Sequence, residues 1–238
     1  AQVCLVSKGK AQARIVLAQE NDANRKAAQL LQRFVRETSG GELPIVANGR
    51  RSKNCVVIGE STDEATDDGY VIDCSRGTLA IKTAGGKGAI YGVAALFEKQ
   101  LGVDYLAKDF YTLTPSADVR IPQMHVEESP AFRFRQTFSY SNNDSTYRDW
   151  MRLQEHREMF AADMWVHTFD RLLPSSVYGK SHPEYYSFIN GERRPGNHSQ
   201  WCLTNPDIFE IVAHRIDSIF KANPNQNMIS VSQNDGND

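Results

Sequence analysis

Two short stretches in the C-terminal half of the sequence place polar, protonatable side chains directly after apolar runs. In the first, Met-Trp-Val leads to His167 and Asp170, and in the second, Met-Ile-Ser-Val-Ser leads to Asn234 and Asp235. Apolar runs of this length are typical of interior strands. Residues just past the carboxyl ends of parallel strands line the binding sites of α/β sheets and barrels. The sequence therefore predicts a pocket to which both stretches contribute.

Acid–base chemistry is what such a pocket could perform. Hydrolysis of a glycosidic bond usually needs two carboxyl groups, one that protonates the leaving oxygen and one that attacks the sugar or activates water. Asp235 and Asp170 are the candidate catalytic pair, and Asp238 and Glu184 are further candidates. Each member of the pair also has a structural interpretation. Asp235 lies in Asn-Asp-Gly, which is typical of turns, and Asp170 can cap a helix or a loop.

The predicted substrate-binding residues are Arg135, His167, Asn234, Trp165 and His182. A guanidinium on an inner strand must be paired or bind something, because burying it alone is costly, so Arg135 is expected to contact a sugar or a carboxylate. His167 is either a substrate contact or a hydrogen-bonded core histidine. Trp165 can stack on a pyranose face or fill the core. The histidines are too scattered to form a metal signature, and no metal site is predicted.

Composition narrows the classes of partner. The chain has 40% hydrophobic and 24% charged residues and a net charge of −2, as in an ordinary soluble globular protein. Its 27 basic residues are offset by 29 acidic ones, which argues against nucleic acid as a partner. No apolar run approaches the roughly 18 residues that span a bilayer. The glycine-rich residues 84–88 lack the Walker spacing; they either cradle phosphate or let a loop turn tightly, and no cofactor is predicted.

The four cysteines lie far apart, at positions 4, 55, 74 and 202, without a Cys-x-x-Cys pair. This spacing argues against a zinc ribbon or a thioredoxin-like site. Buried or free thiols are expected. The alternative is one disulfide, if the protein is exported. Residue 1 is Ala rather than Met, so an export signal could have been removed.

The first 126 residues predict an α+β domain. Strand-like runs cover residues 14–18, 44–46, 55–59, 70–74 and 78–82. The last two runs flank Ser75-Arg76-Gly77, which predicts a tight hairpin. An amphipathic helix begins at Asn21 or Asp22 and ends at Ser39-Gly40-Gly41, and a second helix covers about residues 89–101. This order favours a sandwich with its helices on one face of a sheet.

A second unit is expected from Ser129-Pro130, after a connector over residues 112–128. Strands are predicted at residues 132–138, 164–167, 199–203 and 228–232. Helices are predicted at residues 149–160 and 206–220, and Asn190-Gly191 predicts a hairpin turn. Because strand-helix-strand order implies parallel pairing, these elements favour a parallel sheet.

Several motifs carry a resemblance to known families. Asp68-Gly69-Tyr70-Val71-Ile72 and Gly88-Ala89-Ile90-Tyr91-Gly92-Val93, with the order of elements around them, resemble the accessory α/β domain that precedes the barrel in family 20 β-hexosaminidases and family 67 α-glucuronidases. The remainder resembles large bacterial proteins classed as domain of unknown function 4838. It does so at His182-Pro183-Glu184-Tyr185-Tyr186, Cys202-Leu203-Thr204-Asn205-Pro206 and Ser230-Val231-Ser232-Gln233-Asn234-Asp235-Gly236.

The resemblance to family 20 implies roles for individual residues. The first barrel strand of that family carries Pro-x-Phe-x-x-Arg-Gly, whose Arg holds sugar hydroxyls, and a similar sequence here implies that role for Arg135. The second strand ends in His-Trp-His-Leu-Thr-Asp, which matches His167 and Asp170. The fourth ends in Gly-Gly-Asp-Glu, where Glu is the general acid. Here Asp235 is retained but Gly236 stands in place of that Glu, so the resemblance does not carry the general acid over.

The sequence thus predicts an accessory α/β domain over residues 1–126, an α+β sandwich, followed by the first half of a TIM-like (β/α)8 barrel over residues 127–238. A whole barrel takes about 250 residues, so residues 127–238 are enough for only about half of one. The predicted function is a glycoside hydrolase-like protein that cleaves complex glycans by general acid/base hydrolysis. The alternative is a non-catalytic carbohydrate-binding or scaffolding protein with a degenerate pocket. A third possibility is a hydrolase of another bond, but no Gly-x-Ser-x-Gly elbow in the sequence supports it. An oligosaccharide or polysaccharide is the expected partner, and the expected location is periplasmic or extracellular.

Overall fold

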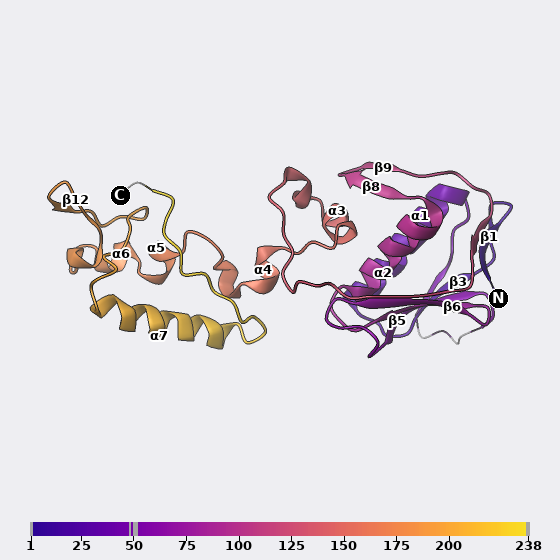
Figure 1. Ribbon diagram of the computed structural model, residues 1–238, viewed down its shortest axis with the longest axis horizontal. Helices are drawn as coiled ribbons and strands as arrows, with labels where there is room; N and C mark the ends of the chain where they lie inside the picture. Colours follow the sequence, from indigo (N-terminus) through magenta and orange to yellow (C-terminus); the bar gives the residue numbers. More distant parts are fainter. Residues whose placement is uncertain (1, 48, 50–51, 237–238) are drawn as a thin grey trace. The chain divides into compact units, whose positions relative to one another are not determined.

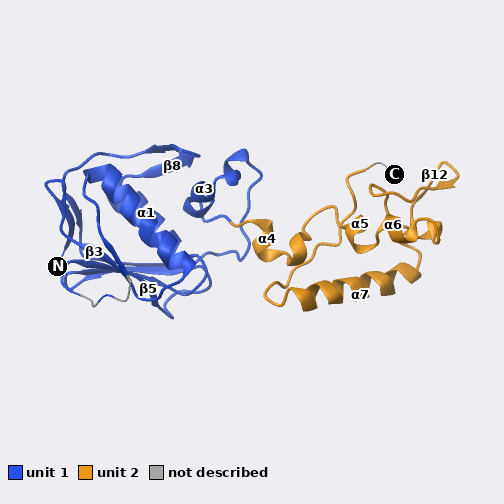
Figure 2. Cartoon of the chain, turned by 180° about the vertical axis from the view of Figure 1, so that it is seen from behind, with its two compact units in different colours: residues 1–153 blue, residues 154–238 orange. Residues whose placement is uncertain are grey.

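The computed structural model describes residues 2–47, 49 and 52–236, which fall into two compact units (Figure 2). Unit 1 comprises Ala1–Leu153 and unit 2 comprises Gln154–Asp238. The predicted domain boundary after residue 126 stays a prediction. No helix of the described residues is long and apolar enough to cross a membrane.

Unit 1 is built on a six-stranded sheet in the order β11-β6-β7-β5-β3-β4. Its strands are β3 (Arg14–Leu17), β4 (Ile45–Ala47), β5 (Cys55–Ser61), β6 (Tyr70–Ser75), β7 (Thr78–Thr83) and β11 (Met124–Glu128). Strand β3 is parallel to β4 and β5, and β5 is parallel to β7, whereas β6 is antiparallel to β7 and β11. Helices α1 (Asp22–Ser39) and α2 (Gly88–Leu96), the latter followed by a π-helix at Phe97–Leu101, cover one face (Figure 1). The predicted helices on one face of a sheet are therefore present.

Local sequence explains the ends of these elements. The Asn21 side chain accepts a hydrogen bond from the backbone N–H of Asn24 at 2.9 Å, so α1 has the expected N-cap. At its other end Gly40 adopts a φ of 78°, and its N–H donates to the Arg36 carbonyl. Residues 76 and 77 both have positive φ, 49° and 80°, as a two-residue turn between β6 and β7 requires.

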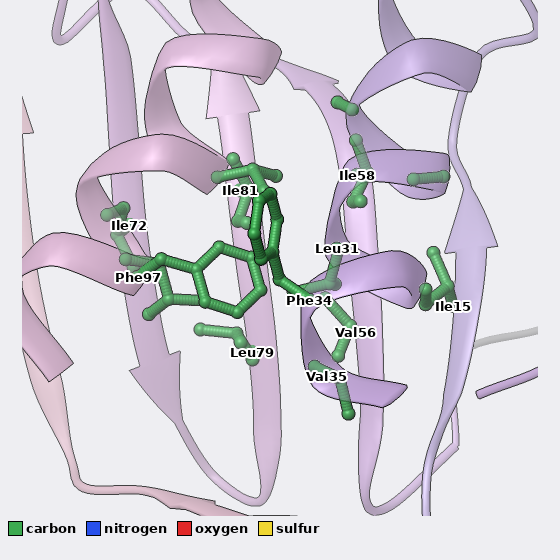
Figure 3. Packing of buried hydrophobic residues seen from close by; sticks show 14 of the residues in the cluster. Ile15, Leu31, Phe34, Val35, Val56, Ile58, Ile72, Leu79, Ile81 and Phe97 are labelled. Carbon is green, nitrogen blue, oxygen red and sulfur yellow. The ribbon is translucent and has the colours of Figure 1, made fainter. Parts of the chain in front are cut away.

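The core of unit 1 lies between the helices and the sheet (Figure 3). Leu31, Phe34 and Val35 of α1 face residues of the central strands such as Val56 and Ile81. The Phe34 ring lies 5.4 Å from that of Phe97 and 5.2 Å from that of Trp150. All of these side chains are buried, so the helices are held by apolar contact over their whole inner face.

The glycine-rich residues 84–88 turn the chain tightly from β7 into α2. A Cβ at Gly88 would lie 2.1 Å from the Gly69 carbonyl oxygen, and one at Gly92 would lie 2.7 Å from an Ile81 methyl. The glycines thus bring α2 close to the sheet, as the structural interpretation of this stretch predicts.

Residues 112–128 are more than a connector, which corrects the sequence interpretation. They include β10 (Val119–Ile121), which pairs with β1 (Val3–Ser7) in a sheet completed by β2 (Lys10–Ala11), and β11, which pairs with β6. Val119 and Ile121 are buried in the core. A further hairpin joins β8 (Asp104–Ala107) to β9 (Phe110–Thr112). Pro115 and Pro122, which favoured a connector, lie between these strands.

Residues 129–153 also pack on unit 1, and two predictions fail there. Residues 132–138 form no strand, and the predicted helix at 149–160 is broken into α3 (Ser145–Trp150) and α4 (His156–Met159), with Arg152 at a φ of 56° between them. A short 3-10 helix, Tyr140–Asn143, precedes α3. Arg152 forms a two-pronged ion pair with Glu98 at 2.8 and 2.9 Å, which fixes the segment to the first turn of the π-helix.

Unit 2 consists of short helices, one hairpin and one long helix. After α4 come a 3-10 turn at Ala161–Asp163, α5 (Phe169–Leu172), α6 (Ser175–Tyr178), a 3-10 turn at Pro183–Tyr185, β12 (Phe188–Ile189), β13 (Glu192–Arg193) and α7 (Asp207–Ala222). The predicted Asn190-Gly191 turn joins β12 to β13, with φ of 52° and 84°. The predicted long helix is present as α7, and Asn205 accepts a hydrogen bond from the Asp207 N–H at its start.

The predicted barrel strands of unit 2 are not regular strands in the described part of the chain. Residues 199–203 contribute one antiparallel bridge, between Trp201 and Tyr186. The runs around Met164 and Met228 do lie side by side in parallel: a bridge joins Phe160 to Met228, and the Ser230 N–H donates to the Met164 carbonyl at 2.8 Å. The ladder is broken because residues 162, 163 and 167 have φ between 50° and 60°, outside the extended region.

Candidate functional site

The two parallel runs of unit 2 bring three predicted site residues together where they end. His167 Nδ1 lies 3.2 Å from the Gln233 carbonyl oxygen. The backbone N–H of Asp170 donates to Asn234 Oδ1 at 3.4 Å. The Thr168 N–H donates to the Ser232 carbonyl at 3.1 Å, which holds the two runs together just before these contacts. His167 and Asp170 thus lie beside residues 233 and 234, which are more than 60 residues further along the chain.

Asn234 is the buried centre of this arrangement, with 4% of its surface exposed. Its Nδ2 donates to the Ser199 carbonyl at 2.8 Å, and its backbone N–H donates to Gln200 Oε1 at 3.1 Å. In return Gln200 Nε2 donates to the Asn234 carbonyl at 2.9 Å. The side chain predicted to contact substrate therefore ties three segments together. It positions Asp235, the next residue.

Asp235 is exposed and lies in a bend. None of the described residues forms a hydrogen bond or an ion pair with its carboxylate. The next residue, Gly236, packs against the chain: a Cβ there would lie 2.6 Å from the His198 carbonyl oxygen. A glutamate at position 236, as in family 20, would therefore clash with backbone. The further candidate Asp238 lies outside the described residues.

Asp170 is half-buried in the first turn of α5 and serves as a cap. Its Oδ1 accepts hydrogen bonds from the Ser175 N–H at 2.9 Å and from the Ser175 hydroxyl at 2.8 Å. This contact fixes the start of α6. The capping interpretation of Asp170 is therefore correct, and Oδ2 is the carboxylate atom that it leaves for other contacts.

Trp165 and His182 each stack on a neighbour within unit 2. The Trp165 ring lies 4.5 Å from that of His156 at an interplanar angle of 19°, and His156 Nε2 lies 2.9 Å from Asp163 Oδ1. Sequence reasoning missed this histidine–aspartate pair because the left-handed backbone at residue 163 has no signal in the sequence pattern. One face of Trp165 is thus covered by protein.

His182 pairs with the acid two residues along the chain. Its ring stacks on that of Tyr185 at 4.7 Å, and its Nδ1 lies 3.0 Å from Glu184 Oε1. Hydrogen bonds from the Glu184 backbone N–H and from His182 hold the pKa of the Glu184 carboxyl below its usual value. Glu184, a further candidate acid, is therefore an exposed member of a surface pair.

Trp201 fills the core of unit 2. It is 7% exposed, and its ring stacks on that of Phe169 at 3.8 Å and 6°. Tyr185 and Tyr186 are buried in the same cluster. These three aromatic residues therefore fill the core of unit 2.

Arg135 belongs to unit 1, which corrects its placement on an inner strand of the second unit. Its Nη2 lies 2.7 Å from Asp68 Oδ2, and its Nε donates to the Arg152 carbonyl at 2.7 Å. The guanidinium carbon also lies 5.7 Å from the centre of the Tyr91 ring. Arg135 and Asp68 are about 15% and 14% exposed, so the guanidinium that had to be paired is paired within unit 1.

The cysteines of the chain are all unpaired thiols. Cys55 and Cys74 are buried, and Cys4 and Cys202 are half-buried. Cys202 Sγ lies 3.5 Å from the Thr204 hydroxyl, and hydrogen bonds from Thr204 and Arg193 lower the pKa of this thiol.

Comparison with solved structures finds bacterial glycosidases at low similarity. A Streptomyces plicatus β-hexosaminidase variant in complex with its product aligns with a TM-score of 0.41 and 17% identity, over 57% of this chain and 24% of that one. A β-N-acetylhexosaminidase from Streptomyces coelicolor A3(2) aligns with a TM-score of 0.42 and 17% identity, over 57% and 25%. The chain thus spans about a quarter of their length. Comparison with curated proteins found no match.

Family models cover most of the chain. Residues 7–127 match glycosyl hydrolase family 20, domain 2, and residues 105–238 match domain of unknown function 4838. Each match spans half of the chain or more, and both resemblances noted in the sequence are confirmed. The chain therefore belongs to the family defined by domain of unknown function 4838, and its N-terminal half is a domain 2 of glycosyl hydrolase family 20.

Proposed function

We propose that the chain is part of a glycoside hydrolase-like protein that acts on complex glycans, and that unit 2 supplies a wall of its sugar-binding pocket. The observation that carries this proposal is the meeting of His167 with Gln233 and of Asp170 with Asn234, where two parallel runs end. In α/β barrels this is the edge at which substrates bind. The family 20 domain supports the same class of protein.

The proposed reaction is hydrolysis of a glycosidic bond by general acid/base catalysis. Asp235 is the acid or base, because its carboxylate is exposed while buried Asn234 fixes its backbone. Asp170 is the second carboxylate and acts through Oδ2, since Oδ1 accepts hydrogen bonds from Ser175. One group protonates the leaving oxygen while the other attacks the sugar or activates water.

The second candidate function is non-catalytic carbohydrate binding. Two observations favour it: the Asp170 carboxylate already caps α6, and position 236 has no room for the glutamate of family 20. In this case His167 and Asp235 bind sugar hydroxyls and no bond is cleaved. The two functions share a pocket and differ in whether turnover exists.

Turnover and binding measured together separate the two functions. The full chain and its Asp235→Asn variant are assayed against a panel of aryl glycosides, and binding to plant and host glycans is measured by calorimetry. For an enzyme, the variant loses turnover by about 10²- to 10⁴-fold, the usual contribution of acid–base catalysis, and keeps sugar binding. The control Asp217→Asn removes a carboxylate paired with Lys221 on α7 and leaves both unchanged.

Binding without turnover in the parent chain establishes the second function. A chain that neither cleaves nor binds any glycan contradicts both proposals.

We also propose that unit 2, the part of residues 127–238 that does not pack on unit 1, contributes strands of a β/α barrel and that the protein works in the periplasm or outside the cell. The parallel bridge between Phe160 and Met228, with α7 in the intervening chain, supports the barrel. Fractionation of cells that express the full-length protein tests its location. Protein found only in the cytoplasmic fraction contradicts that part of the proposal.

A further inference from the structure

Three potential metal ligands of unit 1 lie together on its sheet. His125 and Glu127 are two residues apart on β11, so both side chains point to the same face. Glu64 comes from the loop between β5 and β6, and its Oε2 lies 3.3 Å from His125 Nε2. One ligand atom from each of Glu64, His125 and Glu127 lies within 4.8 Å of the others, and all three residues are exposed.

This group lies on the face of the sheet that the helices leave open. Met124 and Val126, which alternate with the two ligands along β11, pack against the core beneath the helices. His125 and Glu127 must therefore point to the opposite side of the sheet, away from α1 and α2. The group belongs to unit 1 and shares no residue with the proposed sugar pocket.

The donor set suits a divalent transition cation. One imidazole and two carboxylates are ligands that Zn²⁺ accepts, at about 2.0–2.2 Å from each ligand atom. Two atoms on one ion are then at most about 4.4 Å apart, so the present spacing needs only small rotations of exposed side chains. The imidazole distinguishes this group from a mere collection of acids, because nitrogen ligands favour zinc and similar metals over calcium or magnesium.

A lysine supplies positive charge at the same place. Lys82 Nζ lies 3.5 Å from Glu64 Oε1. Its ammonium partly offsets the negative charge of the two carboxylates. A divalent ion that binds there repels this ammonium and must displace it. Removing this charge should strengthen cation binding, whereas a purely structural salt bridge predicts no cation binding in either case.

We propose that Glu64, His125 and Glu127 bind Zn²⁺ or a similar divalent transition cation on the open face of the unit 1 sheet, with water completing the coordination. The ion joins β11 to the loop that carries Glu64. The same loop carries Asp68, the partner of Arg135, so binding also stiffens the attachment of residues 129–153.

Calorimetric titration of the full chain with Zn²⁺ under reducing conditions tests the proposal. One saturable site is expected. His125→Ala and Glu127→Gln should each weaken it at least tenfold, because loss of even an outer partner of a metal site costs about 10- to 100-fold. Lys82→Met should tighten it. The control His214→Ala removes an exposed imidazole on α7 that belongs to no such group among the described residues and should change nothing.

Titration with Co²⁺ tells this site from the thiols. Nitrogen and oxygen ligands give only weak visible bands, whereas a cysteine ligand adds an intense thiolate charge-transfer band. Circular dichroism confirms that each variant is folded, and the nearly isosteric Glu127→Gln decides the matter if His125→Ala is unfolded. Absence of saturable binding at millimolar Zn²⁺, binding through thiols, or binding unaffected by Glu127→Gln overturns the proposal.

Discussion

The two units form the hydrogen bonds of their backbones and bury their apolar residues in different ways. In unit 1 a six-stranded sheet and two helices enclose one continuous core, and ladder hydrogen bonds connect most of the strands. In unit 2, where the strands of the described residues form one short hairpin, isolated backbone hydrogen bonds and single polar side chains connect the segments instead. Asn234 and Gln200 bind each other's chain segment, and the Thr168 hydroxyl donates to the Ser230 carbonyl at 2.8 Å. Unit 1 therefore depends on one large core, whereas unit 2, which holds the candidate sugar site and has a smaller apolar cluster, depends more on individual hydrogen bonds.

The largest expected effect tests the dependence of unit 1 on packing. Phe34→Ala removes a fully buried ring that contacts Phe97 and Trp150. We expect the free energy of unfolding of unit 1 to fall by about 3–5 kcal/mol, measured by chemical denaturation. The exposed Phe209, on α7, provides the control, since Phe209→Ala should change stability by less than about 0.5 kcal/mol. A loss below about 1 kcal/mol for Phe34→Ala would contradict the single-core description.

The next effect tests the dependence of unit 2 on hydrogen bonds. Asn234→Ala leaves the Ser199 carbonyl and the Asp170 N–H without their partner. We expect a loss of about 1–3 kcal/mol from unit 2, seen as faster amide hydrogen exchange around residues 168–170 and 199–200. Exchange in unit 1 should stay as it was. Equal acceleration in both units would show that the comparison between them is wrong.

A third substitution tests why glycine stands at position 236. Gly236→Glu supplies the acid of family 20 but places a Cβ against the His198 carbonyl. We expect destabilisation of about 1 kcal/mol or more and no gain in turnover on aryl glycosides. Gly236→Ala separates the two effects, because it brings the same steric conflict without a carboxylate. A stable and active Gly236→Glu variant would refute the steric explanation.

The smallest effect is a pH dependence in unit 1. Tyr70 and, at 3.3 Å, Lys99 Nζ hold the pKa of the Glu128 carboxyl below its ordinary value of 4.5. Because the folded pKa is depressed, this stabilisation is present above about pH 4.5 and is lost as the pH falls through the lower folded value. Glu128 is half exposed, so we expect Glu128→Gln to cost under about 1 kcal/mol at neutral pH and to flatten the acid limb of the stability curve. Glu42→Gln, at a surface pair with Arg36, is the control.

Local signals predicted the elements that depend on local contacts. The cap at Asn21 and the glycine at position 40 define α1, and the paired positive-φ positions define two hairpins. Strands β10 and β11 were missed because their partners are remote: Ile121 pairs with Val3, and Val126 pairs with Ile72. Their short runs carry little periodicity without those partners.

Sequence reasoning predicted which candidate-site residues lie close together only where the direction of the chain alone determines their position. Parallel runs that end together predict that the residues after each run lie close to each other, and His167 and Asp170 do contact Gln233 and Asn234. The partner of Arg135 could not be predicted, since Asp68 is 67 residues away and lies on a loop. The strands of unit 2 were overpredicted because nothing in the sequence indicates the left-handed backbone at Ala162.

The attachment of residues 129–153 decides where the chain can be cut. A fragment that stops at residue 127, where the family 20 match ends, would remove Trp150 from the aromatic cluster around Phe34 and take Arg152 from Glu98. Such a fragment would present a bare aromatic surface to solvent and would tend to aggregate. Expression trials of the N-terminal domain should therefore place the stop codon after Leu153 rather than after residue 127, where the family 20 match ends.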